Sequence, residues 1–95
     1  MEGNITMRNE MERLLKEELR VLAIRTRDRL HLTQREMASK LEMSESSYSD
    51  IETGRTKCST LTAVLLLCMQ DEPKNFLQTV EAKFAAHYEG ELQPV

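Results

Sequence analysis

Residues that interrupt helices are scarce in this sequence of 95 residues, which has two prolines, three glycines and no tryptophan. No segment shows the sustained alternation of β-branched and polar residues that predicts strands. Apolar residues recur instead at steps of three and four, which is the pattern of amphipathic helices. The sequence therefore predicts an all-α protein.

Long hydrophobic runs are also missing. No run approaches the roughly 18 apolar residues that a membrane span needs, and the opening segment MEGNITMRNE has no apolar core of the secretory type. We expect a cytoplasmic protein with no membrane partner. The two cysteines, Cys58 and Cys68, do not form a C-x-x-C pair. Both should be reduced, with Cys68 in the core and Cys58 in a loop.

Motifs for catalysis and for cofactor binding are absent from the sequence. It contains no nucleophile with a recognisable histidine and acid, no glycine-rich phosphate loop and no pair of histidines on one helical turn. Its histidines, His31 and His87, are far apart and are expected at the surface. We expect a protein that is not an enzyme and that has no metal, no cofactor and no small-molecule ligand.

Positive charge is in the minority, and the formal net charge is -3. This disfavours a nucleic-acid partner, because phosphate neutralisation supplies much of the affinity for DNA. The distribution is uneven, however. From Arg20 to Lys57, eight Lys and Arg face six Asp and Glu, a balance of +2, whereas the remainder carries -5. If the protein has a DNA-binding face, that face is expected in the middle of the sequence.

Apolar spacing and capping residues predict five helices in a single domain, residues 1–95. They cover about residues 7–30, 33–41, 44–53, 59–69 and 73–88. The first helix is long for so small a domain, so its first turns should project beyond the core. Gly90 is expected to follow the end of the last helix, and the final five residues should be loose.

Residues 33–53 are predicted to form a helix-turn-helix, in which the second helix enters the major groove of DNA. Thr33 and Glu36 fit a capping box, Ser44 is a favourable N-cap, and Gly54 fits the left-handed residue that ends a helix. The residues expected to pack the two helices together are Ala38, Leu41, Tyr48 and Ile51. Alternatively, Tyr48 could place its hydroxyl on a phosphate.

The stretch from Arg27 to Ser59 resembles the XRE family, which includes the Cro proteins and the lambdoid phage repressors. Three segments carry the resemblance: LTQREMA at 32–38, MSESSYSDIE at 43–52 and TGRTK at 53–57. The resemblance implies a five-helix, phage-repressor-like DNA-binding domain, here with an extended first helix. It also implies double-stranded DNA as the partner.

The resemblance also implies a role for particular residues. The DNA-contacting residues would be Thr33, Gln34, Ser44, Glu45, Ser46, Ser49, Asp50, Arg55 and Lys57. Of these, Glu45, Ser46 and Ser49 would reach base edges, and Gln34 would touch a phosphate, although its amide can also bridge to the next helix. Arg27 and Glu52 would form a structural salt bridge.

Two departures from the family pattern affect this prediction. Glu42 stands in the turn where glycine is usual, so it must accept a positive φ or the turn must differ. Glu45 and Asp50 place carboxylates on the face that should approach a polyanion. A carboxylate can nevertheless read cytosine, because it accepts a hydrogen bond from the N4 amino group.

The leading functional hypothesis is a sequence-specific transcriptional regulator that binds a palindromic operator as a homodimer. A two-fold dimer reads two half-sites about one DNA turn apart, which multiplies specificity. The alternative is a protein-interaction or antitoxin-like module on the same scaffold, with weak DNA binding or none. The acidic balance of the chain motivates this alternative.

Overall fold

The computed structural model of the protein describes the backbone of residues 2–92 and the side chains of residues 7–86. The helices are α1 (Glu2–Arg29), α2 (Gln34–Lys40), α3 (Glu45–Thr53), α4 (Thr60–Cys68) and α5 (Pro73–Leu92). No strand occurs between residues 2 and 92. The all-α prediction is confirmed, and so is the presence of five helices.

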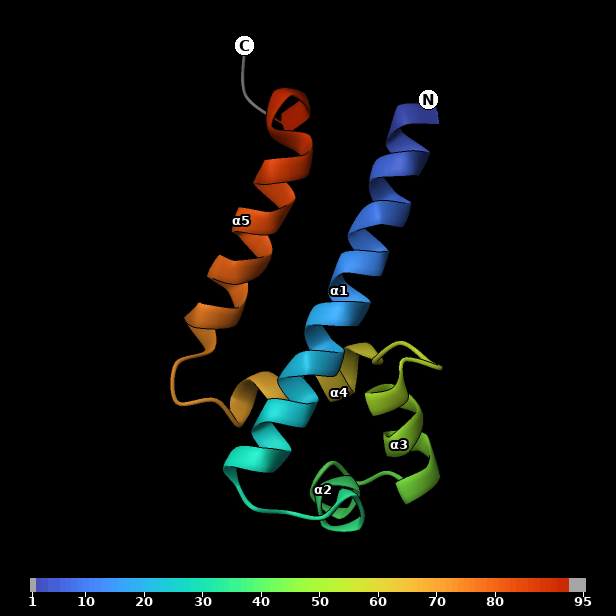
Figure 1. Ribbon diagram of the computed structural model, residues 1–95, viewed down its shortest axis with the longest axis vertical. Coiled ribbons are helices and arrows are strands. Elements are labelled where there is room, and N and C mark those ends of the chain that lie inside the picture. The colour runs from blue at the N-terminus through green and yellow to red at the C-terminus, as the bar shows by residue number, and fades with distance from the viewer. Residues whose placement is uncertain (1, 93–95) are drawn as a thin grey trace.

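Helix α1 runs along the length of the molecule, and the other four helices are arranged around it (Figure 1). α2 and α3 pack near its C-terminal end, whereas α5 runs antiparallel to its N-terminal half. α4 lies behind α1, between these two groups. Because α1 and α5 extend beyond the helix-turn-helix, the molecule is elongated and measures 48 × 26 × 17 Å.

The two long helices exceed their predicted bounds. α1 begins at Glu2 rather than near Met7, and α5 continues through Gly90 to Leu92 instead of ending near Tyr88. A glycine inside a helix costs only about 1 kcal/mol relative to alanine, and it ends the helix only when it adopts a left-handed conformation. The predicted loose end was therefore wrong for residues 91 and 92, and residues 93–95 lie outside the described part.

Capping residues define the ends of the helix-turn-helix as predicted. The Glu36 amide donates to the Thr33 hydroxyl at 3.1 Å, and the Thr33 amide donates to the Glu36 carboxylate at 2.9 Å. Ser44 accepts from the Ser47 amide at 3.1 Å. Gly54 has φ +79° and ends α3. These local bonds fix where both helices start and where the second one stops.

Glu42 accepts a left-handed conformation in the turn between α2 and α3, with φ +57°. The amide of Glu42 donates to the Ser39 carbonyl, and the amide of Met43 donates to the Ala38 carbonyl at 3.0 Å. The turn therefore keeps its hydrogen bonds without glycine. Of the two outcomes predicted for this position, the structure shows the positive φ.

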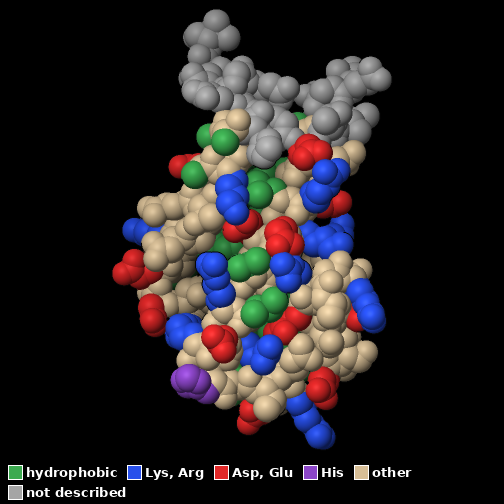
Figure 2. Space-filling view, viewed as in Figure 1, with side chains coloured by type: hydrophobic (Ala, Val, Ile, Leu, Met, Phe, Trp, Pro, Cys, Tyr) green, Lys and Arg blue, Asp and Glu red, His purple; other side chains and the backbone are tan. Residues whose placement is uncertain are grey.

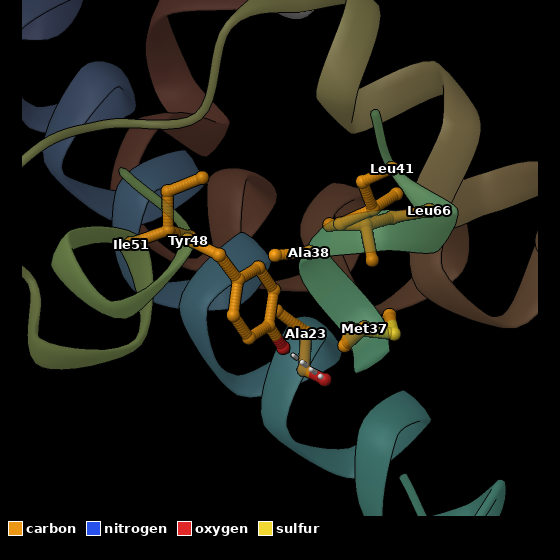
Figure 3. Close-up of a cluster of buried hydrophobic side chains, with 7 residues drawn as sticks. All are labelled: Ala23, Met37, Ala38, Leu41, Tyr48, Ile51 and Leu66. Carbon is orange, nitrogen blue, oxygen red and sulfur yellow. Dashed lines mark hydrogen bonds between the residues drawn. The ribbon is translucent and has the colours of Figure 1, made fainter. Parts of the chain in front are cut away.

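The core lies where α1, α2, α3 and α4 meet (Figure 3). Its buried hydrophobic residues are Ala23, Met37, Ala38, Leu41, Tyr48, Ile51 and Leu66. The small side chain of Ala38 points toward the ring of Tyr48, which is fully buried. The packing residues predicted for the helix-turn-helix are confirmed. Because the Tyr48 hydroxyl is buried, it does not reach a phosphate.

The predicted location of Cys68 in the core was wrong, whereas the prediction of Cys58 in a loop is confirmed. Cys68 is exposed, whereas Cys58 is half-buried and packs against the core, although it does lie in a loop. In α4 the inward residues are Thr62 and Leu66. Cys68 is two residues beyond Leu66 and points about 200° away from it at 3.6 residues per turn. Burial raises the pKa of the Cys58 thiol.

Candidate nucleic-acid interface

The buried carboxylate of Glu52, near the end of α3, accepts hydrogen bonds from residues of α1, α2 and α3. Arg27 of α1 donates to it from Nε at 2.7 Å and from Nη2 at 3.1 Å. Gln34 of α2 donates from Nε2 at 2.8 Å, and the Tyr48 hydroxyl donates to the second oxygen. Only 7% of Glu52 is exposed. The predicted pair of Arg27 and Glu52 is thus part of a larger network.

This network keeps Glu52 ionised. Burial alone raises its pKa, but the hydrogen bonds from Arg27, Tyr48 and Gln34 outweigh burial and hold the pKa below its ordinary value of 4.5. The hydrogen bond to Glu52 likewise raises the pKa of Arg27. Burial, followed by the bond to Glu52, raises the pKa of Tyr48. The orientation of α3 relative to α1 and α2 is therefore fixed by a charged, fully hydrogen-bonded group.

Part of the surface of α3 is open to solvent. Ser44, Glu45 and Ser46 are exposed at its N-terminal end, and Ser49 and Asp50 are half-buried along the same helix. Glu45 makes no ion pair with any described residue. The structure thus leaves all five predicted recognition residues at least partly open to solvent, whereas Tyr48, Ile51 and Glu52 of the same helix are buried.

The two acidic side chains of α3 have different surroundings. Arg55 Nη1 lies 3.8 Å from Asp50 Oδ1, and the Arg55 backbone amide donates to the Asp50 carbonyl at 2.9 Å. The charge of Asp50 is therefore partly offset by the loop that follows α3. Glu45 has no such counter-charge among the described residues.

Thr33 and Gln34, at the start of α2, both form hydrogen bonds within the protein. Thr33 is exposed and serves as the N-cap. Gln34 Nε2 carries two hydrogens, and the bond to Glu52 uses one of them. Gln34 is half-buried. The foreseen bridge from Gln34 to the next helix is therefore present, whereas its contact with a phosphate stays a prediction.

Lys57 lies beside α1 rather than standing alone in its loop. Its Nζ is 3.1 Å from Glu12 Oε2, and both side chains are mostly exposed. This contact brings the loop after α3 next to Arg13 and Lys16, which also line the space there. These two cations were missed from the sequence, because more than 40 residues separate them from Lys57 and no local pattern signals the contact.

Neither a metal site nor a membrane-spanning helix is found in the described part of the chain. No group of three His, Cys, Asp or Glu side chains there is arranged to hold a metal ion. No helix within the described residues combines the length and the apolar character required to cross a membrane.

The comparisons with known proteins agree with this geometry. Residues 17–69, more than half of the chain, match a family model described as a helix-turn-helix domain. The chain therefore belongs to this helix-turn-helix family, which confirms the predicted motif and is consistent with an XRE-like regulator. No curated protein and no solved structure matches the chain.

Proposed function

We propose that this protein is a sequence-specific DNA-binding transcriptional regulator and that α3 is its recognition helix. One observation carries the proposal: the C-terminal end of α3 is locked to the scaffold through Glu52, while its N-terminal end presents Ser44, Glu45 and Ser46 to solvent. A recognition helix needs this combination, because its base contacts depend on a fixed orientation in the major groove.

In this proposal the residues divide into base readers and phosphate contacts. Glu45, Ser46 and Ser49 face the base edges, where Glu45 accepts from the N4 amino group of cytosine. The phosphate contacts come from Thr33, Gln34, Arg55 and Lys57, with Ser44 and Asp50 at the edges of the groove. Phosphate contacts position the protein, whereas base contacts specify the sequence.

We also propose that the DNA-binding form is a homodimer. Helices α4 and α5 expose large apolar side chains: Leu61 is 69% exposed, Leu77 57% and Val64 49%. Burying such side chains against a second copy is favourable. A two-fold dimer would present two α3 helices to half-sites about one DNA turn apart.

Selection of binding sites from random DNA tests the proposal. The expected result is a palindromic site with half-sites separated by about one helical turn. The alternative, an interaction or antitoxin-like module, is favoured by the net charge of -3 and by the unpaired carboxylate of Glu45. Failure to shift any DNA at low salt, together with no selected site, would support that alternative.

Glu45→Gln should change the base preferred at one symmetric position of the selected site. The reason is that an amide donates as well as accepts, and such a contact discriminates between bases by about 1–3 kcal/mol. Glu81→Gln makes the same charge change on an exposed residue of α5 and should leave the preference unaltered. An unchanged profile for Glu45→Gln, or uniformly tighter binding, would show that Glu45 does not read a base.

Arg55→Gln and Lys57→Gln should each weaken binding to all DNA sequences alike. Each variant should lower the salt slope of log K by up to about one unit, because one phosphate contact is lost. Titrations of labelled duplex at several salt concentrations measure this slope. Arg55 is 78% exposed and Lys57 66% exposed, so the fold should tolerate both changes. Slopes equal to wild type would remove both residues from the phosphate contacts.

A further inference from the structure

A stripe of basic residues follows one side of α1. Arg13, Lys16, Arg20 and Arg27 are spaced by three, four and seven residues, which places them on one helical face. The C-terminal part of this stripe contacts α3. Arg27 bonds the Glu52 carboxylate, and Arg20 Nη1 donates to the Glu52 carbonyl at 3.4 Å. The stripe therefore lies on the side of α1 that faces the recognition helix.

The N-terminal part of the stripe meets the loop that follows α3. Together they line a surface hollow of about 520 Å³, formed by Asn9, Glu12, Arg13, Lys16, Arg55 and Lys57. The side chains of Arg13 and Arg55 are 74% and 78% exposed. Segments about 40 residues apart in the sequence thus bring four cations to one open site.

Positive charge is concentrated at this hollow, in contrast to the rest of the molecule. Its lining has four cations and one carboxylate, a balance of +3, whereas the whole chain carries -3. The remaining residues therefore carry -6. On the face shown in Figure 2, Lys and Arg side chains are interspersed with Asp and Glu. A polyanion is the partner that such a local excess of cations favours.

The ion pairs that Arg13 and Lys57 already form at the hollow do not prevent these cations from binding a phosphate. Arg13 Nη1 lies 3.2 Å from Glu10 Oε1, and Lys57 Nζ lies 3.1 Å from Glu12 Oε2. Both ion pairs are largely exposed, and such pairs contribute little to stability. Replacing either carboxylate by a phosphate oxygen would therefore cost the fold little.

We propose that Arg13 and Lys16 extend the DNA-contacting surface from the helix-turn-helix onto the N-terminal half of α1. This inference rests on the proposed DNA binding. Arg13 and Lys16 line the same hollow as Arg55 and Lys57, which the proposed function places on phosphates. The helix-turn-helix match begins at residue 17, so both residues lie outside the matched domain.

The double variant Arg13→Gln with Lys16→Gln tests the inference. The probe is a fluorescent DNA duplex of mixed sequence, about 30 base pairs long and so able to hold two half-sites. We expect weaker binding and a salt slope lower by up to about two units, because two phosphate contacts are lost. The base preference in site selection should remain that of wild type, since phosphate contacts carry no sequence information.

A second double variant, Arg25→Gln with Lys74→Gln, is the matched control. It removes the same charge from exposed positions of α1 and α5 outside the hollow, and its salt slope should stay at the wild-type value. If the Arg13 and Lys16 variant keeps the wild-type slope, or if both doubles lower the slope equally, the inference is overturned although DNA binding stands. If the wild-type protein does not bind the duplex at low salt, the proposed function itself fails.

Discussion

Tyr48→Ala should lower the free energy of unfolding by about 3–5 kcal/mol, the range for removing a large buried ring. Tyr48 is fully buried at the junction of α1, α2 and α3. The substitution leaves a ring-sized cavity and also removes a donor from the Glu52 carboxylate. Urea denaturation followed by circular dichroism measures the loss through the shift of the midpoint.

Tyr48→Phe separates the ring from its hydroxyl. This variant keeps the packing and removes only the bonds to Glu52 and to the Ala23 carbonyl. It should cost about 1–3 kcal/mol, because buried acceptors lose a donor. If Tyr48→Ala costs no more than Tyr48→Phe, packing of the ring does not hold α3 in place.

Arg27→Ala should be the second most damaging change, with a loss of about 3 kcal/mol. Removing one member of a buried ion pair leaves the other charge uncompensated. Here the Glu52 side chain is 6% exposed, although Gln34 and Tyr48 still donate to it. The loss should therefore lie at the lower end for buried pairs. The free energy of unfolding in urea is again the quantity measured.

A double-mutant cycle with Glu52→Gln shows whether the two residues are coupled. The double variant should recover part of the loss, because no unpaired charge is left behind. Arg25→Ala is the matched control on α1, since Arg25 is exposed; its effect should stay within about 0.5 kcal/mol. Strictly additive losses for Arg27 and Glu52 would contradict the pairing.

Under the proposed function, both variants should also affect DNA recognition. The network around Glu52 holds α3 against α1 and α2, so weakening it loosens the surface that carries Glu45 and Ser46. Affinity for the selected site should therefore be compared at temperatures where each variant is still folded.

Local sequence signals predicted the helix-turn-helix with high accuracy. The capping box at Thr33, the N-cap at Ser44 and the left-handed Gly54 each depend on neighbours within four residues. Such signals can be read without knowledge of the fold. The ends of α1 and α5 were predicted less well, because the polar first turns of α1 and the glycine in α5 give no decisive local signal.

The position of Cys68 shows where sequence reasoning failed. Cys68 follows three leucines and was expected in the core, yet it is exposed. The side chains of a continuous apolar run in a helix point in all directions around its axis. Only the packing of the neighbouring helices decides which of these side chains are buried. For α4 this direction is set by Thr62 and Leu66, and Cys58 approaches the core from the loop before the helix.

By itself, the sequence of this protein determined the class of fold, the position of the helix-turn-helix and the buried residues Ala38, Tyr48 and Ile51, because helical periodicity and capping are short-range effects. Only the tertiary structure placed Gln34 on Glu52 and brought Lys57 to Glu12 beside Arg13. These contacts join segments 18 and more than 40 residues apart. They depend on how the helices pack around α1, and packing is a property of the folded chain as a whole.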